Sequence, residues 1–193
     1  MGNTRTRSIE CGRRRTTRGG FSLVEVAVLS VLLLVAVGGL SGAVLSSLRL
    51  SRTTEESALA DEAVRALAAE MRLTPYQSVF RAYNTTTLDD AGLGLAPGSA
   101  FDVTGLTPRS NDPDGRVGRI VFPSVELADG SEALREDFVD PRLGMAKGMD
   151  LNFDGDLLDE FKSDYELLPV RLIVEWTGAG GNRSYELDLL MVQ

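Results

Sequence analysis

The stretch "GGFSLVEVAVLSVLLLVAVGGL", residues 19–40, decides how the rest of the chain is organised. The apolar run that it begins extends from Phe21 to Leu48, and its one charged side chain is Glu25. About 20 apolar residues are enough for a helix to cross the hydrocarbon core of a bilayer. The run therefore predicts a membrane-spanning helix that carries a carboxylate near its start.

The positive charges around this run predict its orientation. Six arginines lie within residues 1–20, whereas only Arg49 and Arg52 follow the run closely. Lysine and arginine collect on the cytoplasmic side of membrane helices. We therefore expect a single-pass protein of the inner (cytoplasmic) membrane, with its N-terminus in the cytoplasm and its C-terminal part in the periplasm or outside the cell.

The charge of the chain is split between a basic start and an acidic remainder. Residues 1–20 carry a net charge of +5, and residues 21–193 carry 14 basic and 27 acidic side chains. An acidic remainder disfavours binding to phosphates, so no nucleic-acid partner is expected. Histidine is absent, which removes the commonest general base and the usual zinc ligand. We therefore do not expect an enzyme.

Three kinds of N-terminal signal contain an apolar run. A secretory signal peptide has a shorter apolar core, followed by a cleavage site with small residues. A plain signal anchor fits the hydropathy but leaves Glu25 unexplained, because a charged side chain within the membrane costs at least about 2.5 kcal/mol. The third kind is a signal that is cut on the cytoplasmic side, before the apolar segment.

The stretch "RRRTTRGGFSLVEVAVLSVLLLVAV", residues 13–37, resembles the N-terminus of the type IV pilin and pseudopilin superfamily. The family motif is matched at every position from Gly20 to Glu25: glycine, phenylalanine, a small hydroxyl residue, leucine, an aliphatic residue and glutamate. The resemblance implies that prepilin peptidase removes residues 1–20 as a leader by cutting after Gly20, and that the new N-terminal Phe21 is methylated. It covers the leader and the first helix.

The resemblance also implies a role for Glu25. In the family, the equivalent glutamate pairs with the N-terminal amine of a neighbouring subunit during assembly. Each charge is costly alone in a medium of low dielectric constant and much less so when paired, so the pair fixes the axial register of adjacent helices. The alternative is that the carboxylate reaches the membrane interface without a partner.

The helical pattern continues beyond the transmembrane segment, residues 21–48. Residues 49–73 are amphipathic, with one apolar stripe formed by Ala60, Ala63, Val64, Leu67, Ala68 and Met71. Proline disfavours helix at the residue before it, so Thr74-Pro75 ends the pattern. We expect a helix from about residue 22 to residue 73. A glycine cluster at residues 38–42 favours equally a bend in this helix and close packing against another helix.

Residues 74–193 predict a globular, β-rich domain. Candidate strands are "AFDVTGL" (100–106) and the clearer "GRIVFPSVEL" (118–127), and residues 169–193 form a hairpin with alternating side chains. A long helix followed by an antiparallel sheet of three or four strands predicts an α+β fold, with the helix across one face of the sheet. Minor pilins and pseudopilins share this arrangement, and the terminal hairpin resembles minor pilins of the PilV type.

An acidic loop at residues 150–160 suggests a metal site. "MDLNFDGDLLDEF" (149–161) places oxygen-bearing side chains at alternate positions around Gly155, as calcium sites do. The candidate ligands are Asp150, Asn152, Asp154, Asp156, Asp159 and Glu160.

The loop begins like an EF-hand and departs from the pattern at its end. Phe161 stands where the bidentate glutamate belongs, so Asp159 or Glu160 would have to supply the closing carboxylate. No helix is predicted just before the loop. Its carboxylates repel one another without a cation, which favours bound Ca²⁺; the alternative is a solvated acidic turn.

The sequence leaves two main functions open. The first is a structural subunit, a minor pilin or pseudopilin of a type IV pilus or a type II secretion-like filament, with prepilin peptidase, other subunits and inner-membrane lipid as partners. The second is a membrane-anchored enzyme or ligand-binding domain that keeps a pilin-like anchor, in which Asp156 and Asp159 would act as an acid/base pair. A DNA-binding pilus tip is disfavoured by the acidic charge of residues 21–193.

Overall fold

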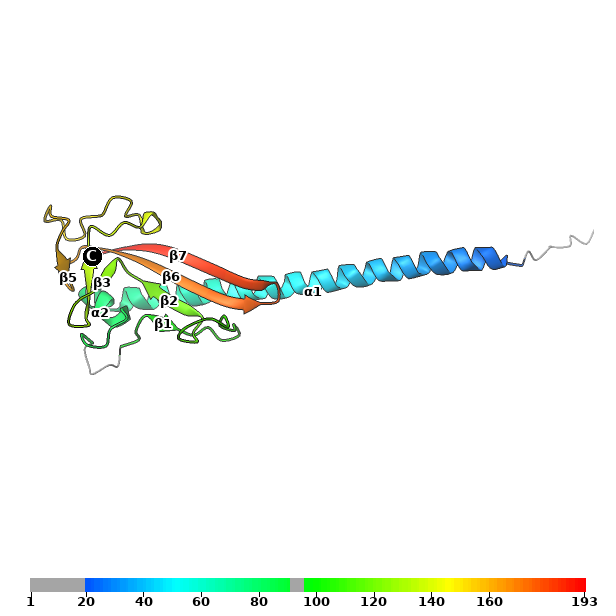
Figure 1. The fold of residues 1–193 in the computed structure, drawn as a ribbon, viewed down its shortest axis with the longest axis horizontal. Helices are drawn as coiled ribbons and strands as arrows, with labels where there is room; N and C mark the ends of the chain where they lie inside the picture. Colours follow the sequence, from blue (N-terminus) through cyan, green and yellow to red (C-terminus); the bar gives the residue numbers. More distant parts are fainter. Residues whose placement is uncertain (1–19, 91–95) are drawn as a thin grey trace, which may run out of the picture. The chain divides into compact units, whose positions relative to one another are not determined.

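The computed structural model describes residues 20–90 and 96–193. The chain divides into two compact units, Met1–Leu45 and Ser46–Gln193. Residues 1–19 of the predicted leader lie outside the described residues. The architecture is α+β, as expected, with one long N-terminal helix and antiparallel sheets (Figure 1).

Helix α1 (Leu23–Leu73) confirms the helix that the sequence predicts. Its apolar part is long enough to cross a membrane, and every residue from 23 to 45 is exposed within the chain. The helix continues without a break through Gly38, Gly39 and Gly42. Apart from the neighbouring backbone of the helix itself, no atom of the described residues would lie within 4 Å of a Cβ atom at any of these glycines, so their surroundings are open.

The second part of α1 belongs to the globular unit and buries the predicted stripe. Ala60, Val64, Ala68 and Met71 are buried in the main hydrophobic core. The helix ends at Leu73, and a 3₁₀ turn (Tyr76–Ser78) and the short helix α2 (Val79–Tyr83) follow Pro75. The proline therefore ends the helix where the sequence predicts.

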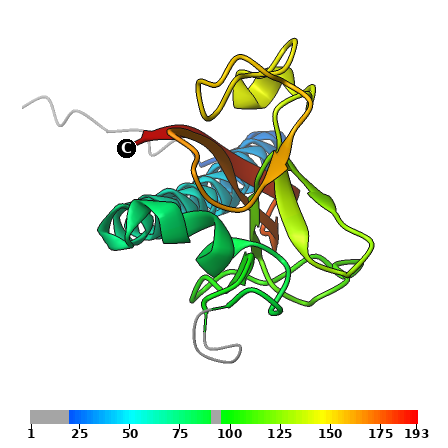
Figure 2. The same cartoon turned by 90° about the vertical axis from the view of Figure 1, so that its left-hand side faces the viewer.

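Two antiparallel sheets among the described residues complete the globular unit. The first has the order β1-β2-β6-β7, with β1 at Ala100–Phe101, β2 at Gly118–Val121, β6 at Leu167–Gly178 and β7 at Gly181–Val192. The second has the order β3-β4-β5, with β3 at Ser124–Glu126, β4 at Glu132–Arg135 and β5 at Glu160–Phe161. In Figure 2, strands β3 and β4 of the second sheet, in yellow-green, lie away from α1, and β5 is orange.

The β6–β7 hairpin confirms the strongest strand prediction. Its strands pair in register up to Gly178 and Gly181, so a two-residue turn joins them. One face of β6 buries four side chains in the core that α1 shares, namely those of Val170, Leu172, Val174 and Trp176. The carboxylate of Glu56 on α1 accepts hydrogen bonds from Trp176 Nε1 at 3.2 Å and from the Ala179 amide at 3.1 Å, which fixes the end of the hairpin on the helix.

Two strand predictions need correction. "GRIVFPSVEL" is not one strand: Pro123 has no amide hydrogen to donate, and the chain divides there into β2 and β3, which lie in different sheets. Within "AFDVTGL" only Ala100–Phe101 pairs as a strand. The remainder turns at Gly105, whose φ of +94° favours glycine.

The hairpin core predicts a matched pair of stability variants. Leu172→Ala removes a side chain that is 0 % exposed and should lower the free energy of unfolding by about 2–5 kcal/mol. Leu190→Ala, on the neighbouring strand, removes a side chain that is 54 % exposed and should change it by at most about 0.5 kcal/mol. Denaturant unfolding in detergent micelles, followed by the fluorescence of the single Trp176, measures both; equal effects would contradict this assignment of the core.

Candidate metal centre

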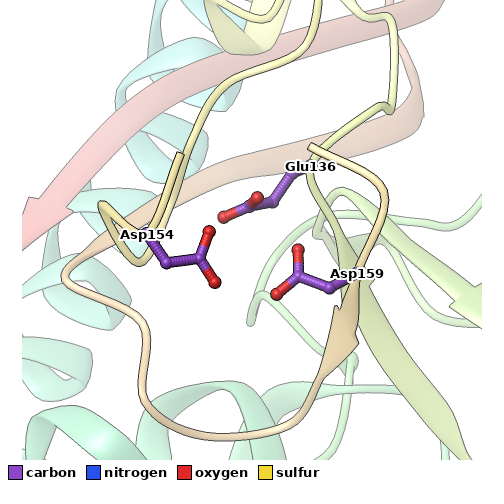
Figure 3. A group of neighbouring side chains, drawn as sticks. All are labelled: Glu136, Asp154 and Asp159. Carbon is purple, nitrogen blue, oxygen red and sulfur yellow. The ribbon is translucent and has the colours of Figure 1, made fainter. Parts of the chain in front are cut away.

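Three carboxylates from two separate segments converge in the globular unit. Glu136, Asp154 and Asp159 each offer an oxygen, and these three oxygens lie within 4.8 Å of one another. Figure 3 shows their side chains pointing toward a common space. Glu136 is buried, Asp159 is half-buried and Asp154 is exposed, so the group extends from the interior to solvent.

Glu136 directly follows β4 and is held by the backbone of the acidic loop. Its Oε1 accepts hydrogen bonds from the amides of Leu151 and Asn152. Its carbonyl oxygen accepts a hydrogen bond from the Met149 amide at 2.9 Å. Gly148 lies against the same carbonyl, since a Cβ atom on Gly148 would be 2.6 Å from that oxygen. This approach requires glycine at position 148.

Leu151 closes the base of the acidic loop. Its side chain is 0 % exposed and belongs to the main core. Its carbonyl oxygen accepts hydrogen bonds from the amides of Glu166 and Leu167, at 2.7 and 2.9 Å. Since its own amide donates to Glu136, one buried residue connects the end of β4, the loop and the start of β6.

The acidic loop is a series of turns, in each of which a side-chain oxygen accepts a hydrogen bond from a backbone amide further along the chain. Asn152 Oδ1 accepts from the Asp154 amide at 3.0 Å, Asp154 Oδ1 from the Asp156 amide at 2.8 Å, and Asp156 Oδ1 from the Leu158 amide at 3.0 Å. The carboxylate of Asp150 accepts from the Gly155 amide at 3.0 Å. Aspartate and asparagine favour such turns, and Gly155 has a positive φ of +86°.

The carboxylate oxygens of this centre outnumber the hydrogen-bond donors around them. Glu136 Oε2, Asp150 Oδ1 and Asp159 Oδ1 are buried and have no hydrogen-bond partner. Asn152 Nδ2 donates to Asp154 at 3.0 Å and to Asp159 at 3.2 Å. Among the described residues, no salt bridge involves Glu136, Asp154 or Asp159. Buried carboxylate oxygens are normally paired or bound to a metal, and this group can hold a metal ion.

Burial shifts the protonation of Glu136. The pKa of Glu136 is raised to about 7, mainly because burial removes its hydration; the charge of Asp159 also raises this pKa, and the hydrogen bonds from the Leu151 and Asn152 amides lower it. A metal ion at this position would replace the proton and favour the ionised carboxylate.

The structure brings together only part of the predicted ligand set. Asp154 and Asp159 join the cluster, whereas Asp156 is exposed and Glu160, in β5, faces Arg135 with an N–O distance of 3.9 Å. Glu136 was not predicted, because a glutamate at the end of a strand carries no metal motif and lies outside the loop.

The predicted processing and assembly residues lie in the other unit. Gly20 and Phe21 precede α1, and the side chain of Phe21 is 73 % exposed. Glu25 is exposed in the first turn of α1. The motif is therefore accessible along its whole length from Gly20 to Glu25.

Comparison of the chain with protein-family models, with curated proteins and with solved structures finds no match.

The raised pKa of Glu136 predicts a pH dependence in metal-free protein. In the folded state the group keeps its proton up to about pH 7, whereas the ordinary value for the unfolded chain is 4.5. Folded protein therefore binds more protons between these values, and the free energy of unfolding should fall as pH rises from about 4.5 to 7.

Denaturant midpoints in a chelator, measured from pH 4.5 to 8 through Trp176 fluorescence, test this prediction. Glu136→Gln removes the titrating group and should flatten the slope in this window. A slope that persists unchanged in Glu136→Gln would assign the pH dependence to other groups.

Proposed function

We propose that the protein is a structural, non-enzymatic subunit of a membrane-borne filament: a minor pilin or pseudopilin of a type IV pilus or a type II secretion-like filament. The single observation that carries the proposal is the complete motif from Gly20 to Glu25 at the start of an exposed apolar helix. The continuation of that helix into a folded α+β unit supports it, because a subunit needs both an assembly segment and an outward-facing domain.

Cleavage after Gly20 creates the charge that Glu25 requires. The new amine of Phe21 is positive and lies at the end of a helix that is otherwise apolar. The free-energy cost of placing a carboxylate and an amine in a medium of low dielectric constant is much smaller when the two are paired than when either is alone. Pairing between the amine of one subunit and Glu25 of the next therefore drives assembly and sets the axial step between helices.

The exposed apolar side chains of α1 must be shielded from water, and two environments can shield them. They include Val24, Leu29, Leu33, Leu34 and Leu40, each more than half exposed within the chain. Before assembly, bilayer lipid surrounds them in the inner membrane, with the N-terminus in the cytoplasm. In the filament, the same side chains pack against the helices of neighbouring subunits. The open glycine positions 38, 39 and 42 allow close approach of a second helix there.

Calcium is the ion that suits the acidic cluster. All three side chains supply carboxylate oxygens, and Ca²⁺ takes six to eight oxygen ligands, including water, in flexible geometry. Zinc, copper and nickel favour nitrogen and sulfur ligands, and the chain has no histidine and a single cysteine. In a secreted filament domain, the ion would serve structure rather than catalysis.

Processing is tested by the intact mass and N-terminal sequence of protein purified from its native membrane. We expect a chain that begins at methylated Phe21. Gly20→Val should leave residues 1–20 attached, because a branched side chain replaces the glycine at the cleavage position. Wild-type protein that retains its first 20 residues would instead be a signal-anchored protein.

Assembly is tested by Glu25→Gln in cells that contain the other filament components. We expect normal insertion and cleavage but at least about tenfold less subunit in sheared filaments, since the amine of the neighbour loses its counter-charge. Glu62→Gln, an exposed position of α1 in the globular unit, is the matched control and should assemble normally. Unchanged assembly of Glu25→Gln would contradict the proposed role of Glu25, whereas wild-type protein that is absent from sheared filaments would favour an anchored enzyme or ligand-binding domain.

A further inference from the structure

Glu136 combines full burial with an oxygen that has no partner. The side chain is 0 % exposed, and its Oε1 is occupied by the amides of Leu151 and Asn152. Its Oε2 is buried without a hydrogen bond, and the side chain points toward the carboxylates of Asp154 and Asp159 (Figure 3). A buried acceptor that points at two other acceptors is stable only with a proton or a cation between them.

The surrounding backbone holds this carboxylate in place. Gly148 lets the chain pass against the Glu136 carbonyl, and the Met149 amide donates to that carbonyl. Leu151, in the core, donates to the carboxylate itself. The deep side of the centre is therefore built from the end of β4 and from residues 148–151, at the start of the acidic loop.

We infer that Glu136 is the deep ligand of a divalent cation whose other protein ligands are Asp154 and Asp159, so that the ion joins the end of β4 to the acidic loop. This inference rests on the calcium site proposed above and is independent of the filament role. The site differs from an EF-hand loop, whose protein ligands all come from one segment of twelve residues. Here the closing carboxylate comes from a strand end that precedes the loop.

The ion would determine whether the acidic loop stays close to Glu136 at the end of β4. Residues 153–158 contribute no buried side chain, and Phe153, Leu157 and Leu158 are exposed. Among the described residues, the side-chain contacts that hold Asp154 and Asp159 near Glu136 are the two hydrogen bonds from Asn152. Without a cation, three carboxylates repel one another at this point, and the loop should open more often.

The experiment uses the full chain in detergent micelles, stripped with EDTA and titrated with CaCl₂ in a calorimeter. Glu136→Gln keeps the shape of the side chain and removes its charge, and should weaken Ca²⁺ binding at least about tenfold. Asp156→Asn makes the same change in charge within the loop, outside the cluster, and should weaken binding less than about threefold. An EF-hand-like loop predicts little effect from Glu136→Gln, because Glu136 lies outside its sequence.

Chymotrypsin provides a second measurement, because it cuts after exposed Phe and Leu side chains. Cleavage between residues 153 and 158 should be at least about tenfold slower in CaCl₂ than in EDTA for the wild type and for Asp156→Asn. In Glu136→Gln, the CaCl₂ concentration that protects the wild type should slow cleavage much less.

Misfolding of the variant is distinguished from loss of the ligand by its unfolding midpoint in EDTA. Glu136→Gln should be at least as stable as the wild type there, since it removes a buried charge. The inference is overturned if Glu136→Gln binds Ca²⁺ as the wild type does, or if Asp156→Asn loses as much affinity. Wild-type protein that binds no Ca²⁺ overturns both this inference and the calcium proposal, while the processing and assembly tests of the filament role are unaffected.

Discussion

The packing of α1 against the β6–β7 hairpin is the contact on which the globular unit depends. The helix supplies small side chains, Ala60, Val64 and Ala68, and the hairpin supplies larger ones, including Leu172 and Trp176. Small residues let the helix backbone approach the sheet closely, and large residues fill the remaining volume. The hydrogen bonds from Trp176 and Ala179 to Glu56 then fix the position of the hairpin along the helix.

One electrostatic constraint links the two proposed sites. In our proposals Glu25 and Glu136 are both carboxylates placed where ionisation is costly: Glu25 in an apolar helix that crosses the membrane, and Glu136 in the protein interior. In our proposals each obtains positive charge from outside its own fold: Glu25 from the amine of a neighbouring subunit, and Glu136 from a cation. A charge without a counter-charge in its own chain is well suited to binding a partner. The partner supplies the counter-charge and so removes the free-energy cost of an unpaired charge.

The sequence predicts those features that depend on local pattern. The limits of α1 follow from the apolar run and from Pro75, and the hairpin follows from the alternation of Val170, Leu172 and Val174. Residues 118–127 are divided between two sheets because β2 pairs with β1 and β6, whereas β3 pairs with β4. The residue pattern of this segment does not predict those partners. Pro123 is the one local signal of that break.

The candidate site is likewise only partly predictable from local sequence pattern. Alternating acidic residues around Gly155 indicate a metal-binding loop, and Asp154 and Asp159 do lie together. Glu136 is absent from that prediction because it reaches the loop through tertiary contacts, above all the hydrogen bond from the Leu151 amide. A deep ligand contributed by another segment has no fixed spacing from the loop, so no motif describes it.

Leu151 determines how far the effect of a cation would extend. Its side chain lies in the main core, and its carbonyl binds the start of β6. These contacts do not involve the cluster, so the base of the loop is fixed by hydrophobic packing and backbone hydrogen bonds. The part beyond Asn152 has exposed side chains and depends on polar turns. A cation at Glu136 would therefore change the order of the loop tip far more than that of the core, which lets an ion regulate an outward-facing surface while the helix and the hairpin stay folded.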